Sequence, residues 1–461
     1  MRERIMEQKK FHVNLAVLAT GMMSFAGVLI ETAMNVTFPT LIKEFGITTS
    51  QVQWVTTIYL LMISIVVPLS SYLIKNYSKR QLFLASSLFF VAGVVIDAFA
   101  FSFSMLLIGR LLQGVATGIA LPLMFNIILT KVPLEKRGMM IGIGNLTTSI
   151  APAMGPTYGG ILTTQLDWKY IYILLLPILA ISTLIGLYAI PKEEQSKTDS
   201  INMKAAIYLS VMFTGLLFFF SYLQSVFGFI SLAIGIVAAI LFYKANQEKT
   251  LLNLNVFSNK MFSIYLASFL IYQVLLLGVS FVLPNYIQIV SEVPASRAGV
   301  MMFPGALVGA LFAPLSGQML DKLGFKKPIG IGILTAIVGW LGLIFVIQTG
   351  NMLLITTCHV IFMIGVGLSY SNVMTVGLSA IDTTLQDDGN AVFSTLQQFM
   401  GAISTSFVAI ILDVFQRSNS DYKVGTQIGA KVALISLFIL LIITSVFVFK
   451  TFSKNNEKST I

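Results

Sequence analysis

Charged residues are scarce in this sequence. Asp, Glu, Lys and Arg make up only 10% of the 461 residues, whereas an average soluble domain is about 25% charged. A soluble chain of this length would form about three domains, and so few charges could not solvate the surfaces of three such domains. Hydrophobic residues make up 56% of the chain. We therefore expect it to fold in lipid.

Reactive and metal-binding residues are also scarce. Cys358 is the only cysteine, and His12 and His359 are the only histidines. These numbers argue against an intrachain disulfide, a thiolate or histidine-rich metal site and a Ser-His-Asp hydrolase. No GxxxxGK[ST] loop is present. We expect no enzyme activity, no metal and no cofactor, so an ion gradient must supply the energy for any work.

Long apolar runs dominate the chain. A membrane-spanning helix needs about 20 apolar residues, and the first run begins at Val13 and is too long for the apolar part of a signal peptide. The sequence predicts an all-α polytopic membrane protein. The fourteen predicted spans lie near residues 13–34, 51–74, 81–101, 105–130, 138–163, 169–190, 204–223, 226–243, 262–289, 297–320, 326–347, 351–380, 391–414 and 431–450. Only Gln224 and Ser225 separate the spans within 204–243, so a re-entrant hairpin is the alternative there.

The positions of the basic residues predict the orientation. With the N-terminus inside, the inner segments hold 22 of the 29 Lys and Arg residues, the outer segments hold six, and Arg110 lies within a span. Both termini are therefore predicted to be cytoplasmic in a cell membrane. The basic residues form short clusters rather than a basic helix, so nucleic acid is not an expected partner. The Ile-, Asn- and Lys-rich composition points to a low-GC bacterium.

Two inner loops suggest an internal repeat. The segments SYLIKNYSKR (71–80) and GQMLDKLGFKK (317–327) both place small or apolar residues before a short basic turn. Parallel repeats about an axis along the membrane normal are a known transporter plan. The predicted organisation is a cytoplasmic N-terminus (1–12), a six-helix half (13–190), a linker with two additional helices (191–261), a second six-helix half (262–450) and a cytoplasmic tail (451–461).

Four segments carry a family resemblance. GRLLQGVATG (109–118) matches an Arg-x-x-Gln-Gly motif, and GNLTTSIAPAMGPTYGG (144–160) matches the Gly-Pro-x-x-Gly-Gly motif typical of exporters. IETAMNVTFP (30–39) places Glu31 where the family usually has Asp, and the loop 317–327 fits an inter-span loop motif. With these segments, nearly the whole chain resembles the major facilitator superfamily, specifically its fourteen-span drug:proton antiporters. The loop 71–80 departs from the pattern, with Lys75 where Asp is expected.

The resemblance implies a monomeric exporter that exchanges protons for small amphipathic, often cationic drugs by alternating access. A dedicated exporter of one endogenous amphiphile, such as a lipid precursor or a peptide-like metabolite, is the alternative within transport. A transport-dead membrane sensor is the alternative from another class. The resemblance also implies a gating role for two groups of residues: Gly155, Pro156, Gly159 and Gly160 in the fifth span, and Gly317, Asp321 and Gly324 in the loop after the tenth.

Ionisable residues within spans are functional candidates, because each costs about 2.5–3.5 kcal/mol to insert. Glu31, Asp97, Arg110 and Asp413 all fall in the predicted outer halves of their spans, so they could share one polar layer. Glu31 is the main proton-carrier candidate. An apolar setting makes both protonation states of a carboxyl group accessible, and a cation would compete with the proton. A permanently paired structural carboxylate is the alternative.

The partner of Arg110 stays open. The resemblance implies that Arg110 tunes the proton site and so favours Glu31. Geometry favours Asp97, because the turn between the two spans centres near Ser102–Ser104 and places Asp97 level with Arg110. Asp413 is either a second protonation or cation site or a cap at the outer end of its span.

Small and polar residues complete the candidate site. Thr147, Ala151, Gly155 and Gly159 recur every four residues, which predicts a face for close helix packing. Prolines 152 and 156 permit a bend in this helix. According to the resemblance, this face packs against the other half. The candidate lining residues of a substrate cavity are Asn35, Gln53, Trp54, Tyr59, Asn285, Tyr286 and Gln288. Trp and Tyr at span ends are alternatively interface anchors.

Overall fold

The computed structural model describes residues 11–193, 202–223 and 225–457, and within these ranges every regular element is a helix. Thirteen of the described helical segments are long and apolar enough to cross a membrane. The remaining predicted span, the fifth (138–163), corresponds to α8 (Leu134–Gln165), which is 32 residues long. The prediction of an all-α polytopic chain is confirmed. Most of the predicted segment 1–12, part of the linker and the last tail residues lie outside the described residues.

The helices before residue 190 form one group, called here the N-terminal bundle. Its long members are α1 (Val13–Asn35), α4 (Trp54–Val66), α6 (Lys79–Ala98), α7 (Phe103–Lys131), α8 and α10 (Leu176–Ala189). The second predicted span is divided into α3 (Thr49–Val52), α4, η1 (Val67–Leu69) and α5 (Ser70–Asn76). Pro68 lies in η1, and it interrupts the helical ladder because it has no backbone N–H. The short α9 (Tyr170–Ile173) precedes α10.

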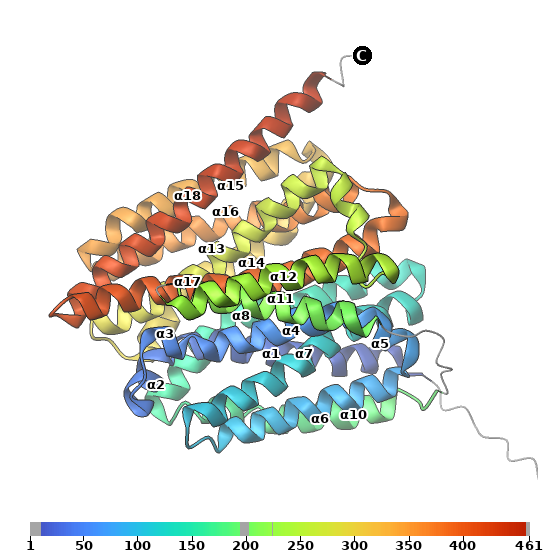
Figure 1. Cartoon of the computed structure of the whole chain (residues 1–461), viewed down its shortest axis with the longest axis horizontal. Coiled ribbons are helices and arrows are strands. Elements are labelled where there is room, and N and C mark those ends of the chain that lie inside the picture. The colour runs from blue at the N-terminus through green and yellow to red at the C-terminus, as the bar shows by residue number, and fades with distance from the viewer. Residues whose placement is uncertain (1–10, 194–201, 224, 458–461) are drawn as a thin grey trace, which may run out of the picture.

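The helices after residue 260 form the C-terminal bundle. They are α13 (Lys260–Val290), α14 (Ala295–Leu323), α15 (Lys326–Val346), α16 (Met352–Ser379), α17 (Gln386–Ser418) and α18 (Tyr422–Glu457). The helix α18 continues beyond its predicted end at residue 450, into the predicted tail. Short 3₁₀ turns η2 (Leu254–Ser258), η3 (Ile347–Thr349) and η4 (Thr383–Leu385) precede α13, α16 and α17. Figure 1 shows the two bundles on opposite sides of the molecule, blue to teal and yellow to red.

Two helices connect the bundles. The helices α11 (Met203–Ser221) and α12 (Val226–Glu248) are 19 and 23 residues long, and each meets the criterion for a spanning helix. They pack closely at Gly215. A side chain at this position would collide with the backbone of α12 at Ser231 and Gly235. Residues 204–243 therefore form two full-length helices rather than a short re-entrant hairpin. In Figure 1 this green pair crosses in front of the junction between the bundles.

The helix α2 (Phe38–Phe45) is absent from the sequence prediction. It has Pro39 in its first turn and ends at Gly46, whose φ of +63° is a left-handed conformation that favours glycine. The indole Nε1 of Trp168 donates a hydrogen bond of 2.6 Å to the Glu44 carboxylate and so holds α2 against the start of α9. This helix lies at the predicted outer end of the bundle, at the left in Figure 1.

Candidate functional site

The side chain of Arg110 occupies the centre of the N-terminal bundle and is fully buried. Its Nε donates to the carbonyl of Val55 at 2.9 Å, and its Nη1 donates to Gln113 Oε1 at 2.7 Å. The guanidinium carbon lies 4.3 Å from the centroid of the Tyr59 ring, a distance typical of a cation–π contact. The remaining Nη2 has no hydrogen-bond partner among the described residues. These contacts fix the guanidinium between α4 and α7.

A glutamine joins Arg110 to Asp97. Gln113 Nε2 donates to Asp97 Oδ2 at 2.7 Å while its Oε1 accepts from Arg110. Neither Asp97 nor Glu31 forms a direct ion pair with Arg110 in the described part of the chain. The expectation that Arg110 pairs directly with Glu31 or Asp97 is therefore corrected. Gln113, a residue of the Arg-x-x-Gln-Gly motif, connects Arg110 to Asp97 by hydrogen bonds. The Asp97 Oδ1 atom lies where a Cβ of residue 109 would be, so Gly109 makes room for this carboxylate.

Glu31 lies on α1 and is only 8% exposed. No described residue donates a hydrogen bond to its carboxylate. One turn earlier, Gly27 faces the Tyr59 hydroxyl, which donates to Thr117 Oγ1 at 3.2 Å. Arg110 is close enough to act electrostatically on both Glu31 and Asp97. Glu31 is therefore a buried carboxyl group near a fixed cation, without a fixed partner of its own in the described structure.

Asn35 and Gln53 lie nearer the predicted outer side. The Thr56 hydroxyl donates to Asn35 Oδ1 at 3.0 Å, and Gln53 Oε1 accepts from the hydroxyls of Thr57 and Ser406. The amide nitrogens of both residues are buried and have no hydrogen-bond partner in the described part. Asn35 and Gln53 thus offer buried donors close to the junction between the bundles.

The remaining cavity candidates are not brought together. The Trp54 ring lies 5.0 Å from the Phe218 ring of α11. The Tyr286 hydroxyl donates to the Ile347 carbonyl, and Asn285 Nδ2 donates to Phe281 of its own helix. Gln288 Nε2 donates to the carbonyl of Val36 at 2.9 Å, at the outer junction.

Asp413 is separate from the Arg110 group. Its carboxylate pairs with Arg417 one turn later on α17, with a distance of 3.0 Å between Arg417 Nε and Asp413 Oδ2. The Arg417 side chain is largely exposed. Asp413 therefore has a fixed partner on its own helix, and no hydrogen bond from it to a backbone group at the end of α17 is present among the described residues.

The glycines of α8 serve two neighbouring helices. A side chain at Gly155 or Gly159 would collide with Thr32 or Ala33 of α1. The next face, about 100° further around the helix, meets α14, where Gly160 lies against the Ala295 carbonyl. Among the described glycines of α8, Gly160 contacts the C-terminal bundle, whereas the expected stripe through 155 and 159 packs on α1. The side chain of Thr147 lies outside the described residues.

The two bundles are joined at their predicted outer side. Among the described residues, eight hydrogen bonds connect them, and all eight use residues in the outer parts of their helices. Thr49 donates to Gln416, and the hydroxyls of Thr57 and Thr405 are 2.9 Å apart. At the opposite end, Gly317, Asp321 and Gly324 lie on α14 or at its end, with open space around both glycines. Gly324 has a φ of +73°, and Asp321 is exposed and forms no ion pair with a described residue.

A family model described as Major Facilitator Superfamily matches residues 20–405. The chain belongs to this superfamily. Lincomycin resistance protein LmrB of Listeria monocytogenes is 33% identical over 419 residues, 89% of each chain. LmrB of Bacillus subtilis is 32% identical over 96% of this chain and 93% of its own. Multidrug export protein EmrB of Haemophilus influenzae is 24% identical over 86% of this chain and 80% of its own. The family predicted from the motifs is confirmed.

The major facilitator fold is also evident in solved structures. A bacterial homologue of the human lysosomal transporter Spinster, in an inward-facing and unoccupied conformation, superimposes with a TM-score of 0.69. It shares 15% identity and is matched over 95% of this chain and 96% of its own. The superfamily and these relatives are transporters, and the chain is a multi-pass membrane protein.

A second polar group in this major facilitator protein contains amides and a phenol, with no carboxylate and no basic side chain. Tyr370 of α16 donates to Gln273 Oε1 of α13 at 2.8 Å and accepts from Gln397 of α17 at 2.7 Å. The Tyr370 ring stacks on Phe269 with 4.4 Å between centroids. The group lies where α17 meets α4, since Gly401 of α17 is close both to Gln273 of this group and to Leu60 of α4. The sequence analysis did not identify these residues.

Proposed function

We propose that this major facilitator protein exports small amphipathic, often cationic compounds in exchange for protons. The observation that carries the proposal is the environment of Glu31, a buried carboxyl group with no fixed partner in the described structure, close to the charge of Arg110. Either a proton or a cationic substrate can neutralise this carboxylate. Because the two exclude each other at one site, their flows are coupled.

The Arg110 group supports this role. Glu31 is buried, and no described residue donates a hydrogen bond to its carboxylate, so no fixed partner holds it in one protonation state. Arg110 itself is held by Val55, Gln113 and the Tyr59 ring, and therefore it does not need Glu31 as a permanent partner. Asp97 is connected to the guanidinium through Gln113, so the side-chain hydrogen bonds of Arg110 do not involve Glu31.

The transport cycle we propose is alternating access between two halves, residues 13–190 and 262–450, with both termini in the cytoplasm. The outer junction is closed in this conformation by the eight hydrogen bonds between the bundles. Proton entry from outside and substrate release require these contacts to separate. Most of them are hydroxyl or amide bonds, which re-form more readily than an apolar core repacks.

The substrate class is supported by two observations. The printed names of the relatives describe lincomycin resistance and multidrug export. In the C-terminal bundle, Gln273, Tyr370 and Gln397 combine amide groups with a stacked aromatic pair. Apolar and aromatic surfaces with a few polar groups are typical of sites for amphipathic ligands.

The experiment that tests the function is efflux of ethidium and lincomycin from bacterial cells that lack their own major efflux pumps. Cells that produce the protein should extrude at least one compound several times faster than control cells, and a protonophore should abolish the difference. Efflux that persists with the protonophore would contradict proton coupling. Well-expressed protein that moves neither compound would remove the multidrug assignment and favour a dedicated exporter.

A further inference from the structure

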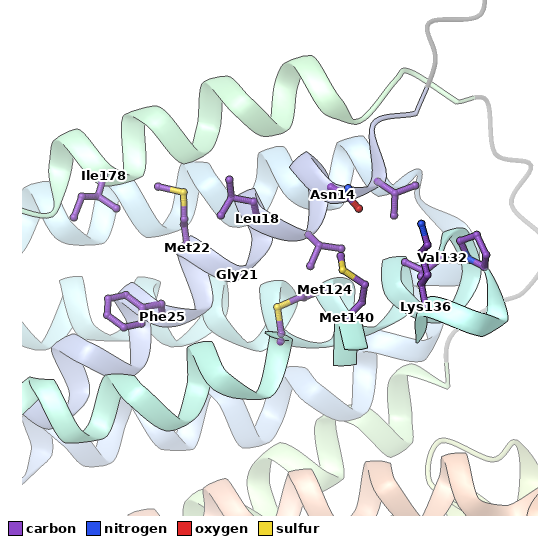
Figure 2. Close-up of a pocket in the computed structure, with 14 residues that line it drawn as sticks. Asn14, Leu18, Gly21, Met22, Phe25, Met124, Val132, Lys136, Met140 and Ile178 are labelled. Atoms are coloured by element: carbon purple, nitrogen blue, oxygen red, sulfur yellow. The ribbon is translucent and has the colours of Figure 1, made fainter. Parts of the chain in front are cut away.

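A groove with a volume of about 680 Å³ lies in the N-terminal bundle, between the predicted inner parts of α1, α8 and α10 (Figure 2). Its walls are mainly apolar. They include Val17, Leu18, Met22 and Phe25 of α1, Met140 of α8 and Ile178 of α10. The volume is within the range of about 300–1,000 Å³ that is usual for ligand sites.

The groove arises because α1 and α8 diverge. At their outer ends they touch, with Gly155 and Gly159 against Thr32 and Ala33. Towards the inner end α8 leans on α7 instead, where Gly144 lies near Met124, Ile128 and Phe125. This leaves one stripe of α1 uncovered. In Figure 2 the side chains of Leu18, Met22 and Phe25 follow this stripe between α10 and α8.

The groove is open on the side of α10, a helix with at most weak contact to the C-terminal bundle among the described residues. Leu18 is 50% exposed and Ile178 is 36% exposed. The wall that contains Ile178 belongs to α10, which packs on α1 and α6 of its own bundle. Exposed Ile181 and Leu184 continue the same apolar surface of α10. In a membrane this surface meets lipid rather than the junction between the bundles.

The inner end of the groove is basic. Lys136 is exposed and forms no ion pair with a described residue, and Asn14 lies near it. The nearby Lys131 is already paired with Glu193 at 2.9 Å. No lining residue is acidic. Each lysine near the cytoplasmic membrane surface raises the affinity for anionic headgroups roughly fivefold.

We propose that this groove binds one anionic phospholipid of the inner leaflet, with its phosphate at Lys136 and one acyl chain along α1 to Phe25. The span from Asn14 to Phe25 is about 16 Å at 1.5 Å per residue, close to half of a hydrocarbon core of about 30 Å. One leaflet chain therefore fits its depth. A cationic substrate does not fit the charge, because Lys136 would repel it. The bound lipid fills the space between α1 and α8.

The test is native mass spectrometry of the purified full-length protein after reconstitution with equal amounts of phosphatidylglycerol and phosphatidylcholine. The wild type should retain one phosphatidylglycerol in preference to phosphatidylcholine. Lys136→Gln should lower this retention roughly fivefold, Lys136→Arg should preserve it, and Leu18→Trp should reduce it by filling the groove. Lys204→Gln is the matched control, since Lys204 is an exposed lysine at the start of α11, outside the groove.

Three results would overturn the proposal. The first is equal retention of the two lipids by the wild type. The second is the same retention by Lys136→Gln as by the wild type and Lys204→Gln. The third is displacement of the retained lipid by tetraphenylphosphonium, which would make the groove a site for cationic substrates. Because lipid retention is measured without transport, failure here is distinguishable from failure of the proposed export function.

Discussion

At the scale of single residues, the structure gives different partners to the four ionisable groups that the sequence placed in one layer. Arg110, Gln113 and Asp97 form a fixed chain of hydrogen bonds. Asp413 pairs with exposed Arg417. Glu31 alone is buried without a fixed partner in the described structure. Among the four, Glu31 is therefore the residue that we propose for proton coupling.

The first prediction concerns Asp413. Its carboxylate is itself buried but pairs with the largely exposed Arg417 at the outer end of α17, so it cannot exchange a proton without breaking that pair. Asp413→Asn should therefore keep its initial rate of efflux within about twofold of the wild type, measured with the compound that cells extrude best. A loss as large as that of Glu31→Gln would place Asp413 in the coupling site instead.

The second prediction concerns Gly109. A methyl group at this position would collide with the Asp97 carboxylate, and overpacking of this kind costs about 1–3 kcal/mol. Gly109→Ala should lower the midpoint of thermal unfolding of the purified protein. Gly317→Ala is the control, because open space surrounds Gly317, and its midpoint should not fall. Equal midpoints for the two variants would show that Gly109 is not needed to accommodate Asp97.

The sequence identified Glu31, Asp97 and Arg110 because a charge within an apolar run is easily recognised. Gln113 was inside a quoted motif, and its position three residues after Arg110 puts both on one helix face, but its partner on α6 depends on the fold. Gln273, Tyr370 and Gln397 were missed for a related reason. They are neutral residues on three helices, and only tertiary packing brings them together.

At the scale of elements, α8 connects the two bundles with adjacent faces. The face with Gly155 and Gly159 meets α1, and Gly160 meets the backbone of α14. Both contacts involve backbone atoms, which cannot move aside as a flexible side chain does. We therefore expect the small residue at position 160 to determine how closely α8 can pack against α14.

The third prediction follows from that contact. Gly160→Ala should weaken the outer closure, because the added methyl group meets the Ala295 carbonyl. A cysteine at position 157, introduced as Thr157→Cys in a Cys358→Ser background, should then react several times faster with a membrane-impermeant maleimide from outside. Gly330→Ala is the control, since its methyl group would have ordinary contacts of 3.6 Å. Unchanged labelling in Gly160→Ala would contradict this role.

Long spans were predictable and short elements were not. A hydropathy window of about 20 residues detects helices that cross the membrane, and it located most of the described spans to within about five residues, whereas α18 extends well beyond its prediction at both ends. The helix α2 is eight residues long and lies at the edge of the membrane region, so such a window has no signal for it. The position of α8 between α1 and α14 was not predictable either. The spacing of small residues in the sequence defines a face of a helix but does not identify the helix that packs on it.

At the scale of the whole molecule, the conformation is closed at the predicted outer side. The bonds between Thr57 and Thr405 and between Gln53 and Ser406 cross the junction directly. Alternating access requires this junction to open once in every cycle. Holding it closed should stop transport without unfolding either bundle.

The fourth prediction uses that requirement. The Thr57 and Thr405 hydroxyls are 2.9 Å apart, so Thr57→Cys and Thr405→Cys together, in a Cys358→Ser background, should form a disulfide on mild oxidation. Oxidised protein should lose efflux, and a reducing agent should restore it. Each single cysteine variant should be insensitive to the oxidant. Full activity of the cross-linked protein would show that this junction does not need to open.

The most direct test of the account is proton movement driven by substrate. Purified protein would be reconstituted into liposomes with a trapped pH indicator, and a substrate identified by efflux would be added outside. The wild type should move protons in response to substrate, and Glu31→Gln should bind substrate but move none. Substrate-driven proton movement that survives in Glu31→Gln would contradict the assignment of coupling to Glu31.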